Sequence, residues 1–140
     1  MYISAVFIKM LLLLVFKSRK FELLYYVLYP VPLQQPSISL TSPNRGLVWG
    51  PEGAEVTKGY SFVFTCSVNP SYPGGCFFLI FSGSSINITQ PAVNLSASFN
   101  FPEAEYEHQG IYSCVYEVTL SRQKFTSTMT TVMSVAIKCK

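Results

Sequence analysis

The chain contains no aspartate, its only histidine is His108 and its only tryptophan is Trp49. All seven acidic residues are glutamates, and charged residues make up only 12% of the 140. Without aspartate there is no Ser-His-Asp triad and no aspartic dyad, and one histidine cannot build a metal site that needs several. A hydrophobic content of 49% and an aromatic content of 15% supply a sizeable core. These values exclude general disorder.

The net charge of +3 is concentrated in the N-terminal segment. Residues 1–35 hold four basic residues and one acidic residue, whereas residues 36–140 hold six of each. The body of the chain is therefore neutral and has no basic stripe that could neutralise phosphates. We expect no nucleic-acid partner, and no motif calls for a cofactor.

Residues 1–35 form a hydrophobic leader with mixed features. The apolar run Met10–Phe16 follows Lys9, as in a secretory signal peptide. The basic stretch Lys17–Lys20 then stands where a small-residue cleavage site belongs, and each apolar run is shorter than the roughly 20 residues of a membrane span. Three interpretations stay open: a cleaved signal or a signal anchor that associates with the membrane, a mis-joined stretch, or a structural part of the domain. We favour the first.

From Pro36 onward the sequence alternates between short β-rich runs and clusters of Gly, Pro, Asn and Ser, which is the pattern of strands and turns. The expected strands are Ser37–Thr41, Glu55–Thr57, Ser61–Val68, Cys76–Ser82, Ile86–Thr89, Leu95–Phe101, Ile111–Leu120 and Phe125–Ile137. Outside the leader, no window has a helical period. Seven or eight antiparallel strands in about 100 residues predict an all-β sandwich over residues 36–138.

Two cysteines sharpen this prediction. Cys66 and Cys114 are each centred in an expected strand, where alternate aromatic residues share their face. Their separation of 48 residues suits a disulfide that pins two sheets together.

The segment Gly110-Ile-Tyr112-Ser-Cys114 resembles the F-strand signature of immunoglobulin domains. Gly110 and Tyr112 match the tyrosine corner, in which the hydroxyl bonds to upstream backbone. The family usually has aspartate where His108 stands, and the variant with histidine is similar to leukocyte immunoglobulin-like and Fc-receptor-type domains. The usual C-strand tryptophan is also missing, and the resemblance implies that Leu79 fills its pocket. The chain also resembles fish immunoglobulin modules that are joined to scavenger-receptor cysteine-rich domains.

Two glycosylation motifs, Asn87-Ile-Thr and Asn94-Leu-Ser, fall in expected loops or edges. The alternative is that they are simply Asn-rich turns. The motif at Asn69 is excluded because proline follows it.

Cys76 and Cys139 remain, and the sequence does not decide whether they pair with each other, link to another chain or stay free. Cys139, between two lysines, is the better candidate for an intermolecular thiol and a disulfide-linked dimer. Their spacing does not suggest a zinc or redox site.

Three further features have a structural and a functional interpretation. We expect His108 to be a structural corner residue rather than a base or ligand. The alternating Glu103, Glu105 and Glu107 are expected to be a solvated turn rather than an acidic rim for a basic partner. For Trp49 we favour a core plug beneath the first strand over an exposed binding residue.

The sequence therefore predicts an immunoglobulin-like sandwich of the I or C2 kind. The resemblance implies a non-catalytic recognition domain of an immune or adhesion receptor-like protein, secreted or at the cell surface, which binds a protein or glycan. The candidate contacts are the Ser71–Cys76 loop and the Ser121–Lys124 turn, at one end of the sandwich. The alternative is a structural spacer in a larger ectodomain, and no motif of an enzyme is visible.

Overall fold

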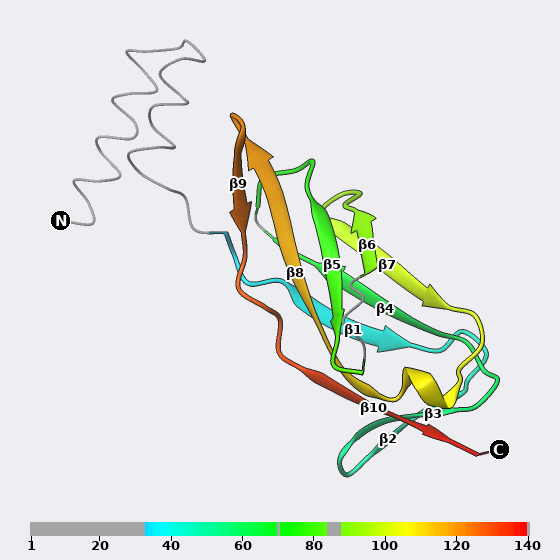
Figure 1. Cartoon of the computed structure of the whole chain (residues 1–140). Helices are drawn as coiled ribbons and strands as arrows, with labels where there is room; N and C mark the ends of the chain where they lie inside the picture. Colours follow the sequence, from blue (N-terminus) through cyan, green and yellow to red (C-terminus); the bar gives the residue numbers. More distant parts are fainter. Residues whose placement is uncertain (1–32, 70, 84–87, 140) are drawn as a thin grey trace, which may run out of the picture. The chain divides into compact units, whose positions relative to one another are not determined.

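The structure is a computed structural model that describes residues 33–69, 71–83 and 88–139 (Figure 1). The leader lies outside the described residues except for its last three. The elements are β1 Ser37–Thr41, β2 Leu47–Gly50, β3 Gly53–Thr57, β4 Phe62–Ser67, β5 Cys76–Phe81, β6 Ile88–Pro91, β7 Ser96–Phe101, a 3-10 turn at Tyr106–His108, β8 Gly110–Leu120, β9 Gln123–Thr126 and β10 Met133–Lys138.

These strands form two sheets. The smaller sheet has the order β1-β4-β7, and the larger has the order β2-β3-β10-β8-β5-β6, with β9 paired to β8. Strand β3 runs parallel to β10, while the other pairs are antiparallel. The β-sandwich expected from the sequence is confirmed.

The alternating apolar residues of β4 and β8 build the core between the sheets. Phe62, Phe64 and Cys66 of β4 are buried, and so are Tyr112, Cys114 and Tyr116 of β8. A disulfide joins Cys66 to Cys114, with Cα atoms 6.4 Å apart, and so crosslinks the two sheets. Next to it, the Phe64 and Tyr112 rings lie 4.4 Å apart between centroids. The aromatic and disulfide core is therefore one continuous unit.

Leu79 lies beside this crosslink. It pairs with Cys114 across β5 and β8, and its side chain is only 1% exposed. The leucine thus contributes to the core at the position where the resemblance implied a substitute for tryptophan.

The connection before β8 is held by the tyrosine corner. The Tyr112 hydroxyl donates a hydrogen bond to the His108 carbonyl, and His108 Nδ1 accepts one from the Glu105 backbone N–H at 2.9 Å. The Gln109 side-chain oxygen accepts from the Ile137 N–H of β10, which ties the corner to the neighbouring strand. The side chains of His108 and Glu105 therefore form their hydrogen bonds inside the turn itself.

The last strand is broken, contrary to the expectation of one strand over Phe125–Ile137. Pairing along β8 shifts by two residues, because Glu117 faces Thr126 on one side of the break and Tyr112 faces Met133 on the other. Within the break the buried Ser127 and Thr130 hydroxyls accept hydrogen bonds from backbone N–H groups of β8, at 2.9 and 3.0 Å. These two side chains replace the carbonyls that a continuous strand would present.

The expectation for Trp49 is wrong. The residue lies on β2, which forms a hairpin with β3 at the edge of the larger sheet, and its side chain is 62% exposed. The sequence interpretation missed this strand, since it began the region at Glu55. The Trp49 side chain lies on the same face of the sheet as the side chain of Ala54, its pairing partner on β3. Ala54 is buried, whereas Trp49 is exposed because β2 lies one strand further toward the edge of the sheet.

Burial raises the pKa of Tyr112 above the ordinary tyrosine value of about 10. The folded protein therefore holds this proton more tightly than the unfolded chain does. Stability from this group is fully present below pH about 10 and is lost as the pH rises above it.

We expect Tyr112→Phe to lose about 1 kcal/mol at pH 7 from the missing hydrogen bond. The free energy of unfolding, measured with urea, should then fall less steeply above pH about 10 in the variant. Parallel curves for the two proteins would contradict this assignment.

Candidate functional site

The two segments proposed as contacts lie at the same end of the sandwich, which we call the loop end: Ser71–Cys76 and Ser121–Lys124. Strand β5 begins there and β8 ends there, since Cys76 pairs with Glu117 (Figure 1). Pro70, next to the first segment, lies outside the described residues. The structure thus places at one end of the domain two segments that are about 45 residues apart in the sequence.

Tyr116 ties the first of these segments to β8. Its side chain is fully buried, and its hydroxyl donates to the Tyr72 carbonyl at 2.6 Å and accepts from the Gly75 N–H at 3.1 Å. Its ring packs on Phe77, with centroids 4.8 Å apart. Two tyrosines of one strand therefore fix the two ends of the domain. The sequence indicated that Tyr116 faces the core, but it predicted a hydrogen bond only for the hydroxyl of Tyr112.

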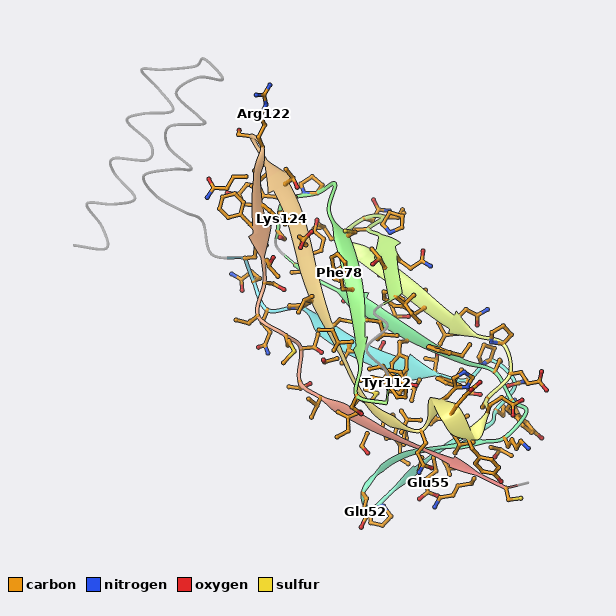
Figure 2. The ribbon with its side chains drawn as sticks, in the orientation of Figure 1. Glu52, Glu55, Phe78, Tyr112, Arg122 and Lys124 are labelled. Carbon is orange, nitrogen blue, oxygen red and sulfur yellow. A yellow bond between two sulfur atoms is a disulfide. The ribbon has the colours of Figure 1, made fainter. Side chains whose placement is uncertain are left out.

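The second segment is a tight hairpin between β8 and β9. Leu120 pairs with Gln123, so that two residues form the turn, and both have positive φ, 52° for Ser121 and 67° for Arg122. Such a turn matches the right-handed twist of the flanking strands. Figure 2 shows Arg122 at the tip of the hairpin, directed away from the sheets. The turn presents an exposed cation on a rigid support.

Below the turn, an ion pair lies across the two strands. Lys124 Nζ is 3.7 Å from Glu117 Oε1, and the two side chains are 67% and 22% exposed. Cys76 lies next to Glu117, where burial and then the Glu117 carboxylate raise the pKa of its thiol, against a smaller opposite effect of Lys124. The thiol of Cys76 therefore stays protonated at neutral pH and is a poor nucleophile.

The outward side of the larger sheet continues from this end as an apolar surface. We call it the outer face, and it comprises Phe78, Ile80, Ile111, Val115 and Met129. Phe78, Ile80 and Val115 are half-buried, whereas Ile111 and Met129 are 46% and 50% exposed. Met129 covers Ser113, whose hydroxyl lies 3.7 Å from the Met129 sulfur. In Figure 2, Phe78 is seen on β5 between the loop end and Tyr112. The outer face and the loop end together form a surface with an apolar centre and charged residues at one end.

The structure describes only one of the two asparagines in the glycosylation motifs. Asn87 lies outside the described residues. Asn94 is exposed in a turn in which Asn94 and Leu95 have φ of 53° and 61°, and which is closed by backbone hydrogen bonds between Val93 and Ser96. The Asn94 side chain is therefore open to solvent.

Cys76 and Cys139 do not pair with each other in the structure. Both are free, and Cys139 is exposed after the end of β10, far from the start of β5 where Cys76 lies (Figure 1). A hydrogen bond to the Cys139 side chain, and then the negative charge that Cys139 carries as a thiolate, raise the pKa of the Tyr106 hydroxyl. Lys58 Nζ lies 5.0 Å from the centroid of the same ring. Of the three glutamates near the corner, Glu105 caps the 3-10 turn, and Glu103 and Glu107 are exposed.

A cavity of about 350 Å³ lies between β5 and the corner. Its walls are mainly apolar and aromatic, and the titratable residues among them are Glu107, His108 and Tyr112. Within the described ranges, no three His, Cys, Asp or Glu side chains are close enough to hold a metal ion. Over the same ranges, no helix is long and apolar enough to cross a bilayer.

Replacing Tyr116 by phenylalanine tests the support of the loop end. The substitution removes the acceptor of the Gly75 N–H and the donor to Tyr72, so we expect a loss of about 1 kcal/mol in stability. Hydrogen exchange followed by NMR should show faster exchange at Gly75 in Tyr116→Phe, because the loop opens more readily. Tyr112→Phe is the matched control and should leave exchange at Gly75 unchanged. Equal protection of Gly75 in wild type and Tyr116→Phe would contradict the assignment.

Comparison with known proteins agrees with this architecture. A family model of the immunoglobulin domain matches residues 52–126. Among solved structures, the crystal structure of CHIR-AB1 is similar with a TM-score of 0.51 and 22% identity, over 76% of this chain and 100% of that one. The crystal structure of the swine CD8aa homodimer has a TM-score of 0.43 and 15% identity, over 72% of this chain and 97% of that one. The search of curated proteins gives no match.

The family model spans more than half of the chain, including both cysteines of the crosslink, and CHIR-AB1 shares the fold. With the two sheets, the disulfide between them and the tyrosine corner in place, the chain belongs to the immunoglobulin domain family.

Proposed function

We propose that this domain is a non-catalytic recognition module of an immune or adhesion receptor-like protein, and that it binds a protein or glycan partner outside the cell. The observation that carries the proposal is the surface formed by the loop end and the outer face. It combines exposed cations at Arg122 and Lys124 with an apolar centre around Phe78. Protein-binding surfaces commonly have such an apolar centre with a polar rim.

The rigidity of the loop end supports this role. Tyr116 fixes the first segment by two hydrogen bonds, and a two-residue turn fixes the second. A pre-formed loop loses less conformational entropy when a partner binds. The finer resemblance to leukocyte receptors, and to fish modules joined to scavenger-receptor cysteine-rich domains, is part of this proposal.

An extracellular location is also part of the proposal. A disulfide between sheets is typical of oxidising compartments, and Asn94 is exposed in a glycosylation motif. Residues 1–35 would direct the chain to the secretory pathway as a cleaved signal or as an anchor, and residues 36–138 would be the recognition domain. Asn87 is the second proposed glycan site. We propose Cys139 as a candidate for an intermolecular disulfide because its side chain is exposed.

The experiment that tests recognition uses the secreted domain as fluorescent tetramers. Tetramers are applied to a panel of leukocyte and epithelial cell lines and to a glycan array, and Arg122→Glu is compared with wild type. We expect binding by the wild type and a loss of at least about tenfold in apparent affinity for Arg122→Glu, because the reversal changes the charge at the tip of the contact.

The matched control is Lys138→Glu, which reverses an exposed charge near the C-terminal end of β10, away from the loop end. It should bind as wild type does. Binding that is equally weakened by both substitutions would contradict the proposed surface. An absence of binding to any cell line or glycan would instead favour the alternative, a structural spacer in a larger ectodomain.

A further inference from the structure

The β2 edge is a part of the domain that the proposed recognition surface does not use. It lies at the opposite end from Arg122, where Figure 2 shows Glu52 and Glu55 on the β2–β3 hairpin. Strand β2 is the last strand of the larger sheet in the described part of the chain, and it pairs only with β3. One side of its backbone therefore faces away from the sheet.

The free backbone groups can be assigned from the pairing. The Thr57 N–H donates to the Gly46 carbonyl at 2.8 Å. Hydrogen-bonded residues alternate along an antiparallel ladder, so Val48 and Gly50 direct their backbone groups toward β3. The Gly46 N–H, by contrast, donates to the Ser42 hydroxyl at 2.9 Å. The N–H and C=O groups of Leu47 and Trp49 then point to the open side. This edge offers two residues whose donors and acceptors can continue the sheet.

The side chains leave this edge unprotected. Natural edge strands commonly carry a lysine, a proline or a bulge that prevents pairing with another chain. The strand Leu47–Gly50 has none of these. Val48 and Trp49 are each 62% exposed, and because they are adjacent they lie on opposite faces of the strand. Both faces of the edge are therefore apolar and available to a second strand.

We propose that the β2 edge pairs, in antiparallel orientation, with the β2 edge of a second copy of this chain. A two-fold axis through Val48 would set Leu47 opposite the partner's Trp49 and Trp49 opposite the partner's Leu47. These are the residues with free backbone groups on both copies, so the edge is complementary to itself.

The charged residues on either side of β2 also favour a second copy of this chain as the partner. Arg45 precedes β2 and Glu52 follows it; both side chains are exposed and neither forms an ion pair within the described ranges. In the antiparallel arrangement Arg45 lies within one residue of the partner's Glu52, and the contact occurs twice by symmetry. A parallel arrangement would bring like charges together. Glu55, whose carboxylate lies over Gly50, is the other charged group beside the strand.

The contact is small, because only one short strand and its flanks take part. Interfaces below the standard size of about 1,200–2,000 Å² are typically weak or transient. We therefore expect a dimer that forms at micromolar to millimolar concentrations. Trp49 is the only tryptophan of the chain, so its fluorescence reports on this edge alone.

The test measures tryptophan emission and sedimentation of the purified protein from about 1 µM to 1 mM. We expect a blue shift of the emission as a dimer forms, because pairing removes Trp49 from water. Val48→Lys places a charge on the edge and should weaken the dimer by at least about tenfold. Val93→Lys is the matched control, since Val93 is 70% exposed in a different turn, and it should dimerise as wild type does.

A charge exchange tests the orientation. Arg45→Glu should weaken the dimer, and the double variant Arg45→Glu with Glu52→Arg should restore it. A non-reducing gel separates this dimer from one linked through Cys139. A monomer at every concentration, a dimer unaffected by Val48→Lys, or a double variant no better than Arg45→Glu alone would overturn the proposal.

Discussion

The disulfide between Cys66 and Cys114 is the constraint on which the other features of this domain depend. It joins the central strands of the two sheets, β4 and β8, and lies against Leu79 and the aromatic core. A crosslink that closes 48 residues stabilises the fold by about 4 kcal/mol when its effect is taken as lost entropy of the unfolded chain. In a domain of about 100 residues this is a large part of the net stability.

Strand β8 transmits this constraint to both ends of the domain. Tyr112 and Tyr116 stand two residues on either side of Cys114, so the three side chains share the inward face. The hydroxyl of Tyr112 reaches the corner at His108, and the hydroxyl of Tyr116 reaches the loop end at Tyr72 and Gly75. The surface proposed for recognition is thus supported by the same strand that carries the crosslink. By contrast, the β2–β3 hairpin is attached at the edge of the larger sheet, and its exposed apolar residues suit a weak contact between copies.

Much of the fold could be predicted from the sequence because apolar residues alternate along β4 and β8, whereas β5 is a continuous apolar run between turn residues. Strand β1 is found with the expected bounds, Ser37–Thr41. The broken last strand could not be predicted, since Thr126–Val132 is as rich in β-branched residues as a strand. The break depends on how Ser127 and Thr130 meet the backbone of β8. The exposure of Trp49 could not be predicted, because it follows from the position of β2 at the edge of the larger sheet, and the sequence did not indicate this strand.

The chain is an immunoglobulin domain crosslinked through Cys66 and Cys114, and we propose that it is secreted or displayed at the cell surface. The most direct measurement is the N-terminal sequence and intact mass of the product from secretory cells, with and without glycosidase, and with thiols alkylated before and after reduction. We expect a start near Pro36, a mass that falls on glycosidase treatment, and Cys66 and Cys114 alkylated only after reduction. An intact, unglycosylated chain retained inside the cell, with all four cysteines alkylated before reduction, would contradict it.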